Sequence, residues 1–276
     1  MQSALYILIF QVIILHFAGT SLKANPLIDV QKKCAIYKKH AWVVLIQRKN
    51  SPNDAEKHVC TGSLISKRHV LTAATCLENL SKEDAEIIVG STETLSSCHQ
   101  KLDIKSYITY KDWFSQQTKP PFRENLDDIA IIEVNVPDTG IQTPDLSLSK
   151  IRPGGKVRFI GWGHEQQNFR PKVPSFIDLK KLNNAECIKY VQELRPSYVE
   201  FVLPEKLFCA MSDTLGLGVE GDFGGPILNG YHAIIGILIR PCPTSEICWK
   251  LPTQPNLVLT LNRNLREFIA DVTQVK

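Results

Sequence analysis

The hydrophobic residues of this chain gather in short runs that are rich in β-branched and aromatic side chains. Four clear runs are Trp42–Ile46, Ile129–Ile132, Val157–Gly161 and Ala233–Ile239. Stretches rich in Pro, Gly and Asn lie between the runs, as they do between antiparallel strands that are joined by turns. The pattern therefore predicts an all-β fold.

Near the end of the chain, the hydrophobic period changes from that of a strand to that of a helix. Four apolar residues follow helical spacing: Leu265, Phe268, Ile269 and Val272. Asn262 and Asn264 stand near the start of this pattern, and either side chain can cap the first turn. The sequence thus predicts a C-terminal helix over residues numbered about 262–273.

The first 22 residues contain no Asp, Glu, Lys or Arg and are mostly apolar, with small residues at Ala18-Gly19-Thr20-Ser21. This pattern indicates a secretory signal peptide over residues 1–22, cleaved at about 19–25. The alternative is a membrane anchor, but Gln11 and His16 interrupt the apolar run and make it short for a span. No later stretch approaches the required length. We therefore expect a secreted, extracellular protein without a membrane span.

Composition and charge fit one globular domain and exclude several classes of partner. The chain has 276 residues, of which 43% are hydrophobic and 22% charged, and its formal net charge of +4 is too small to indicate nucleic acid. The basic cluster from Lys32 to His40 is expected to be a solvated surface, with binding of heparin-like glycans as the alternative. No close pair of histidines, Cys-x2-Cys spacing, phosphate loop or dinucleotide fingerprint is present. We therefore expect no metal and no cofactor.

The segment Gly221-Asp222-Phe223-Gly224-Gly225-Pro226 has the glycine pattern of a tight catalytic turn. It resembles the Gly-Asp-Ser-Gly-Gly-Pro segment of chymotrypsin-like serine proteases, in which backbone N–H groups form an oxyanion hole around an attacking serine. Phe223 stands at the position of that serine. Its benzyl side chain has no nucleophilic oxygen, and its bulk would lie where a scissile carbonyl must approach.

Two further segments resemble the same family. Cys60–Ile65 and His69–Cys76 are similar to its Cys-x-Gly-Ser-Leu-Ile and Val-Leu-Thr-Ala-Ala-His-Cys motifs, and Thr75 stands where the general-base histidine is expected. Asn125–Ile132 resembles Asn-Asp-Ile-Ala-Leu-Leu, which places the triad aspartate at Asp128. A hydroxyl is not basic near neutral pH, so Thr75 cannot replace the histidine. With Thr75 and Phe223 at these positions, we expect the protein not to be an enzyme.

The resemblance also locates the former specificity pocket. Its floor corresponds to Leu217, which has no carboxylate to pair with a basic substrate. The substrate-docking strand of the family corresponds to Ile239, Arg240 and Pro241, and Pro241 lacks the N–H that a bound peptide uses. Two interpretations stay open for Phe223, Leu217 and Ile239: they fill a redundant cavity as core, or they form an apolar recognition surface.

Proteolytic activation is not expected. Active members of the family begin with an Ile-Val-Gly-Gly-like sequence after cleavage, and the nearest counterpart here is Leu27–Val30, without the glycines. In the family, the new ammonium group pairs with the aspartate that corresponds to Asp222. Since an unpaired buried carboxylate is costly, Asp222 is expected either to face solvent or to find another partner.

The resemblance implies two of the disulfides, Cys60–Cys76 and Cys187–Cys209. The family bridge near the pocket has Val219 at its second position, so we expect a local Cys242–Cys248 bridge, which leaves Cys34–Cys98. Spacing alone does not determine connectivity, and these last two pairs are hypotheses. Asn79-Leu80-Ser81 is a sequon for N-glycosylation at Asn79.

The resemblance extends from about Trp42 to the C-terminus and implies a chymotrypsin-like fold. We expect two packed antiparallel six-stranded β-barrels, at about 40–145 and about 155–260, closed by the C-terminal helix, within a serine-protease-like domain of residues 25–276. The short N-terminal region and the loops resemble those of secreted insect members.

The expected function is a secreted, non-catalytic serine protease homologue that binds extracellular proteins. It would act as a regulator, cofactor or decoy in an extracellular protease pathway, with active serine proteases or their substrates as partners. Three alternatives stay open. They are a residual hydrolase that uses Ser63 or Thr75 with Asp128, a glycan-binding secreted protein, and a decaying duplicate without a partner.

Overall fold

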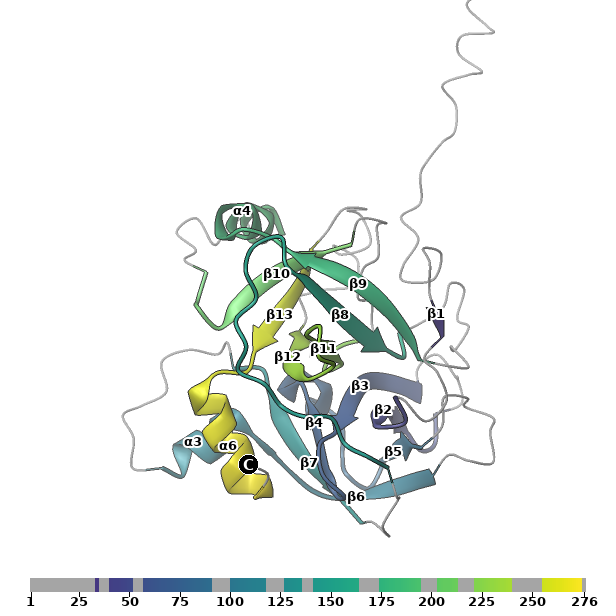
Figure 1. Ribbon diagram of the computed structural model, residues 1–276. Coiled ribbons are helices and arrows are strands. Elements are labelled where there is room, and N and C mark those ends of the chain that lie inside the picture. Colours follow the sequence, from purple (N-terminus) through teal and green to yellow (C-terminus); the bar gives the residue numbers. More distant parts are fainter. Residues whose placement is uncertain are drawn as a thin grey trace, which may run out of the picture.

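The computed structural model consists of two antiparallel β-barrels that pack against each other, with helices at their edges (Figure 1). It describes residues 33–34, 40–51, 57–90, 100–117, 127–135, 141–163, 174–194, 203–212, 221–239 and 255–274. The predicted signal peptide lies outside these residues. The expected all-β architecture of two six-stranded barrels is confirmed.

The first barrel closes through six strands, each paired with the next and the last paired with the first. In order around the barrel they are β2 (Val43–Arg48), β3 (His58–Leu64), β4 (His69–Thr72), β7 (Ala130–Val134), β6 (Gln100–Thr109) and β5 (Ala85–Val89). Strand β2 is nearly continuous in buried apolar residues, because its neighbours β3 and β5 and the second barrel cover it. The predicted run Trp42–Ile46 thus forms a central part of this barrel.

The second barrel also closes through six strands, with a short seventh strand at its outer edge. In order they are β9 (Ser175–Lys181), β10 (Leu207–Met211), β13 (Asn256–Thr260), β12 (Ile234–Ile239), β11 (Pro226–Leu228) and β8 (Lys156–Gly161). Pairing of β8 with β9 completes the ring. The strand β1 (Lys33–Cys34) adds to β9 from outside.

The predicted C-terminal helix is α6 (Arg263–Thr273), and of the two candidate caps it is Asn262 that caps it. The Asn262 side chain accepts a hydrogen bond from the Leu265 N–H at 3.0 Å. Leu265, Phe268 and Ile269 are buried as the apolar spacing requires. Although α6 follows the last strand of the second barrel, it packs against the first one.

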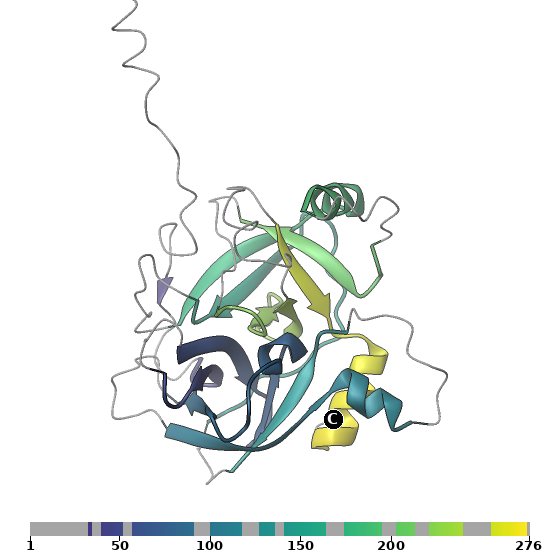
Figure 2. The same cartoon turned by 180° about the vertical axis from the view of Figure 1, so that it is seen from behind.

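The contact of α6 with the first barrel is made through α3 (Tyr110–Ser115), as Figure 2 shows from behind. The Phe268 ring lies 5.6 Å from the Tyr110 ring and 5.5 Å from the Trp113 ring, between centroids. These aromatic contacts hold the two barrels together at one side of the molecule. Two further helices in the described ranges are the 3₁₀ turn η1 (Ala74–Leu77) and α4 (Asn184–Leu194).

Two disulfides brace the described chain, and they are the two that the family resemblance implies. Cys60 bonds to Cys76 and Cys187 bonds to Cys209, with Cα atoms 5.9 Å and 5.3 Å apart respectively. The first bridge ties β3 to η1, and the second ties α4 to β10. The other two expected pairs lie outside the described residues, since Cys98, Cys242, Cys248 and the Cys34 side chain are not among them.

None of the helices in the described ranges is both long and apolar enough to cross a membrane.

Candidate functional site

Thr75 and Asp128 are brought together by the pairing of β4 with β7. These strands are antiparallel, with Thr72 opposite Ala130. Thr75 follows β4 by three residues on η1, and Asp128 precedes β7 by two residues, so both lie just beyond the same end of the strand pair. The register of the first barrel therefore fixes their meeting.

The Asp128 carboxylate accepts hydrogen bonds from Thr75 at both of its oxygens. The Thr75 N–H donates to Oδ1 at 2.8 Å, and the Thr75 hydroxyl donates to Oδ2 at 3.0 Å. Burial raises the pKa of Asp128 above its ordinary value, while hydrogen bonds from Thr75 and the Ala74 backbone act in the opposite direction. The Thr75 hydroxyl is thus a donor to a carboxyl group whose charged form is disfavoured by burial.

The turn Gly221–Gly225 brings Phe223 to this region from the second barrel. Gly221 and Gly224 have φ angles of 90° and 80°, which favour glycine. A side chain at Gly224 would also collide with the first barrel, because a Cβ atom there would lie 2.1 Å from Thr72 Oγ1 and 2.5 Å from the Thr61 carbonyl oxygen. The glycine pattern of the turn therefore serves a close contact between the barrels.

The Phe223 side chain is buried and belongs to the hydrophobic core, with 8% of its surface exposed. Its carbonyl oxygen accepts a hydrogen bond from the Thr61 N–H at 3.0 Å and lies 3.5 Å from Cys76 Sγ. Since Cys76 directly follows Thr75, the nucleophile position of the family lies beside the segment that carries Thr75. All three expected positions, Thr75, Asp128 and Phe223, thus gather where the two barrels meet.

Thr61 joins the two barrels at this junction, a role that the sequence did not indicate. Its hydroxyl donates to the Gly221 carbonyl oxygen at 2.7 Å and accepts a hydrogen bond from the Trp162 N–H at 3.0 Å. Its own carbonyl oxygen accepts a hydrogen bond from Thr72 Oγ1 at 2.9 Å. Thr61 is completely buried, so these partners replace water for its polar groups.

Asp222 is buried and has a hydrogen-bond partner in the protein. This agrees with the second of the two expectations for this residue. It is 1% exposed, and its Oδ1 accepts a hydrogen bond from the Gly163 N–H at 2.7 Å. A Cβ atom at Gly163 would lie 2.3 Å from Asp222 Oδ2, and one at Gly161 would lie 2.2 Å from Oδ1. The Gly161-Trp162-Gly163 turn therefore closes around this carboxylate.

The remaining candidate residues have different surroundings. Ile239 is 5% exposed and belongs to the core, whereas Leu217, Arg240 and Pro241 lie outside the described residues. Ser63, the other hydroxyl considered for a residual hydrolase, is completely buried, with an exposed fraction of 0%. Of the former pocket, only Ile239 is thus described, as core.

Asn79 lies in an exposed turn after η1 and has a φ angle of 59°, a conformation that Asn tolerates better than most residues. In the same sequon, the Ser81 hydroxyl bonds to Asp84 Oδ2 at 2.7 Å. The exposed amide makes the site accessible, and glycosylation of Asn79 stays a prediction.

The three positions that correspond to the catalytic triad carry one hydroxyl, one carboxyl and one phenyl ring. The hydroxyl of Thr75 has no basic lone pair near neutral pH, and Phe223 has no side-chain atom that can attack a carbonyl. Within the described ranges, no group of three His, Cys, Asp or Glu side chains could hold a metal ion.

Comparison with protein families gives the ancestry of this arrangement. Residues 29–245, well over half of the chain, match the family model described as Trypsin. The chain belongs to the trypsin family. This trypsin-family chain is 26% identical over 233 residues to snake venom serine protease CL2 of Trimeresurus stejnegeri, with 81% of each chain covered. It is 27% identical over 179 residues to the vitellin-degrading protease of Bombyx mori, with 62% of each covered.

Solved structures of the trypsin family have the same fold. Neuropsin, a serine protease of mouse brain, matches with a TM-score of 0.62 at 19% identity, covering 88% of this chain and 99% of that one. A mutant of human heparin binding protein also has a TM-score of 0.62 at 19% identity, covering 89% and 96%. These likenesses concern the fold alone.

Proposed function

We propose that this trypsin-family protein is secreted, does not cleave peptides and acts by binding other extracellular proteins. It would serve as a regulator, cofactor or decoy in an extracellular protease pathway. Its partners would be active serine proteases or their protein substrates. The proposal concerns this chain, whereas the relatives are named as proteases.

The main support for a non-catalytic role is the relation of Thr75 to Asp128. In a serine protease triad, the aspartate orients a histidine, and the histidine accepts the proton of the serine. Here the two carboxylate oxygens receive the N–H and the hydroxyl of Thr75, at 2.8 Å and 3.0 Å. No basic atom stands between Asp128 and the position of the nucleophile among these contacts.

The burial of Phe223 supports the same conclusion from the other side of the junction. A nucleophile must be accessible to the carbonyl that it attacks, but this position carries a core side chain that is 8% exposed. Such a residue contributes to packing, and its removal would leave a cavity. Between the two interpretations of Phe223, its burial favours filled core over an apolar recognition surface.

Binding would then depend on surfaces other than the former catalytic centre. Two closed barrels, joined by Thr61 and by the α3–α6 contact and braced by two disulfides, form a rigid scaffold for surface loops. Secretion is supported by these disulfides, which form in oxidising compartments, and by the apolar N-terminal sequence.

A binding experiment can separate this function from simple loss of activity. The purified protein is immobilised and incubated with the extracellular fluid of its source, and the recovered proteins are assayed for serine protease activity. We expect recovery of an active protease or its substrate, and a changed rate of that protease when the protein is added back. Absence of both effects at high protein concentration would contradict the proposal.

Restoring a histidine and a serine at the triad positions tests whether the specificity pocket has also lost the groups that trypsin-like cleavage needs. The double variant Thr75→His with Phe223→Ser is expected not to gain efficient trypsin-like cleavage, because Leu217 offers no carboxylate for a basic substrate. The folded variant is compared with unmodified protein on a peptide with a basic residue before the scissile bond. Rapid cleavage would show that the interpretation of the pocket is wrong.

Glycan binding is a second candidate. It is favoured by the basic cluster from Lys32 to His40 and by the shared fold with a protein named for heparin binding. Elution from immobilised heparin at low salt would exclude it, since polyanion binding by a basic cluster resists moderate salt.

A residual hydrolase is less favoured, because the Ser63 side chain is completely buried and Thr75 donates its hydroxyl to Asp128.

A further inference from the structure

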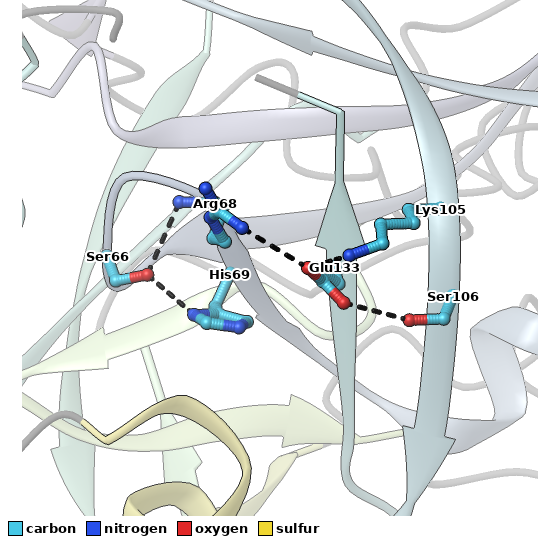
Figure 3. A network of polar contacts seen from close by, with 6 residues as sticks. All are labelled: Ser66, Arg68, His69, Lys105, Ser106 and Glu133. Carbon is cyan, nitrogen blue, oxygen red and sulfur yellow. Dashed lines mark hydrogen bonds and ion pairs between the residues drawn. The ribbon is translucent and has the colours of Figure 1, made fainter. Parts of the chain in front are cut away.

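A second polar cluster lies on the first barrel and shares no residue with the catalytic positions of the family. It surrounds a cavity of about 490 Å³ between the β3–β4 turn, the strand β7 and the C-terminal end of α6. The turn contributes residues 66–68, β4 contributes His69, β7 contributes Glu133, and α6 contributes its last residues with Gln274. Figure 3 shows the polar contacts of the turn and of Glu133.

Glu133 is surrounded by more positive than negative charge. Lys105 Nζ lies 2.7 Å from its Oε1, Arg68 Nη1 lies 3.6 Å from the same oxygen, and the Ser106 hydroxyl donates to Oε2 at 3.2 Å. The hydrogen bond from Lys105 holds the pKa of Glu133 below its usual value, so this carboxylate is charged at neutral pH. One carboxylate faces two cations in this network (Figure 3).

The rest of the cavity wall adds positive charge and no further acid. Lys67 also lines the cavity, whereas α6 contributes only the uncharged residues Val272, Thr273 and Gln274. Two residues of the wall, Lys67 and Arg68, are therefore basic against the single Glu133 carboxylate, and Lys105 adds a further positive charge through its ion pair with Glu133. A cavity with this excess of positive charge attracts anions.

His69 supplies a directed donor to this wall. It lies directly opposite Glu133 in the β4–β7 pair, so both side chains are on the same face. Its Nδ1 is 2.7 Å from Ser66 Oγ. The same oxygen accepts a hydrogen bond from the backbone N–H of Arg68 at 3.3 Å. In the tautomer in which the Ser66 hydroxyl donates to Nδ1, the hydrogen of the neutral imidazole is on Nε2.

The Nε2 atom has no hydrogen-bond partner in the part of the chain that the structure describes. Burial is the main cause that lowers the pKa of His69, Arg68 and Lys105 lower it further, and Glu133 acts in the opposite direction. The imidazole is therefore a neutral N–H donor near neutral pH. At lower pH it becomes an additional positive charge in a half-buried position.

We propose that this cavity binds a small oxyanion, in the form of a carboxylate, sulfate or phosphate group. Arg68 provides a charged donor, and the His69 Nε2–H provides a second donor. Ser66 fixes the orientation of His69, and Glu133 holds Arg68 and Lys105 in place. Because protonation of His69 adds charge at the site, anion binding and proton binding strengthen each other.

Nuclear magnetic resonance of the full-length secreted protein, labelled with ¹⁵N in histidine, tests this site. Sulfate, phosphate and acetate are titrated separately at constant ionic strength, and the His69 signals are assigned with the His69→Gln variant. We expect a saturable shift of the His69 ring signals with at least one anion, and a higher pKa of His69 when that anion is bound. The anion that saturates at the lowest concentration identifies the preferred oxyanion.

Variants distinguish the site from general attraction of anions to a basic surface. Arg68→Gln is expected to weaken binding roughly tenfold, the loss of one charge-assisted hydrogen bond. His69→Gln keeps a neutral N–H donor but cannot gain a positive charge. This variant is therefore expected to bind the anion weakly, with an affinity that does not depend on pH between about 5.5 and about 8. In that variant, uniformly labelled with ¹⁵N, binding is followed through the backbone amide signals of the β3–β4 turn.

Lys49→Gln is the matched control. Lys49 is paired with Asp103 at 2.7 Å and does not line the cavity, so its removal is expected to leave the affinity unchanged. A cooperative thermal transition in each variant verifies folding. A shift that grows linearly without saturation, or equal weakening by Lys49→Gln and Arg68→Gln, would overturn the proposal.

Discussion

Thr75 donates hydrogen bonds to both oxygens of the half-buried Asp128 carboxylate, with its backbone nitrogen 2.8 Å from Oδ1 and its hydroxyl oxygen 3.0 Å from Oδ2. In a trypsin-like enzyme, this carboxylate would orient an imidazole. Here Thr75, on the 3₁₀ turn η1, donates the hydrogen bonds to this carboxylate. Under the proposed function, Asp128 is a structural group of the first barrel instead of a part of a proton relay.

The Thr75 hydroxyl should therefore contribute measurably to stability. Thr75→Val keeps the shape of the side chain but removes the donor to Oδ2. We expect a loss of about 1.5–3 kcal/mol in the free energy of unfolding, as for hydrogen bonds to charged groups. Urea denaturation measures it. Thr143→Val, at an exposed position, is the control and should change stability by less than about 0.5 kcal/mol.

Asp128 and Glu133 should give opposite dependences of stability on pH. Burial raises the pKa of Asp128, so the stability that it contributes is present below the pKa of an unfolded Asp and is lost as pH rises through the folded pKa. The hydrogen bond from Lys105 lowers the pKa of Glu133, so its contribution is present above the unfolded pKa and is lost as pH falls through the folded value.

Denaturation between about pH 3 and about pH 7 measures both effects. Relative to Asp128→Asn, the unmodified protein should become less stable as pH rises through this range. Relative to Glu133→Gln, the unmodified protein should become more stable as pH rises through the same range. The same direction for both pairs would show that the surroundings described for one of these carboxyl groups are wrong.

Thr61 should be required for the junction of the barrels. Thr61→Val removes the hydroxyl that bonds to the Gly221 carbonyl and to the Trp162 N–H, and leaves two buried backbone groups unsatisfied. Each is expected to cost about 1–3 kcal/mol in the free energy of unfolding. Thr61→Ser keeps the hydroxyl, so it should retain most of the stability in the same denaturation experiment. Equal losses in both variants would argue for packing of the methyl group instead.

The close approach of Asp222 to Gly163 gives a fourth prediction. Gly163→Ala places a Cβ atom 2.3 Å from Asp222 Oδ2, which forces the carboxylate or the turn to move. We expect destabilisation of about 1–3 kcal/mol, the usual range for an overpacked interior. Gly230→Ala is the matched control, because its Cβ atom would have no neighbour within 4 Å. Thermal unfolding of both variants should show a lower transition temperature for Gly163→Ala alone.

The sequence predicted the fold of the protein better than it predicted the contacts within that fold. The hydrophobic runs indicated strands, and the family motifs indicated two barrels, since these features depend on residues that are close in the chain. Two helices were missed although local signals exist. Thr109 accepts a hydrogen bond from the Asp112 N–H at the start of α3, and Asn183 and Glu186 bond reciprocally at the start of α4. Both are capping patterns with a spacing of three residues.

Contacts between the barrels could not be predicted in this way. Thr61 and Gly221 are separated by 160 positions in the chain, and nothing in the sequence near Thr61 reveals which turn faces it. The cavity beside His69 similarly depends on the register of β4 with β7 and on the place where α6 ends. For Asp222, the sequence limited the alternatives, and the packing of Gly163 against it decided between them.

The central claim is that Thr75 and Phe223 leave this trypsin-family protein without serine protease chemistry. A fluorophosphonate probe that reacts with activated serine hydroxyls tests it most directly, with an active trypsin labelled in parallel as the positive control. We predict no labelling of the purified, folded protein by the probe. Labelling that disappears with Thr75→Val or Ser63→Ala would contradict the claim, because it would identify an activated hydroxyl in the former catalytic region.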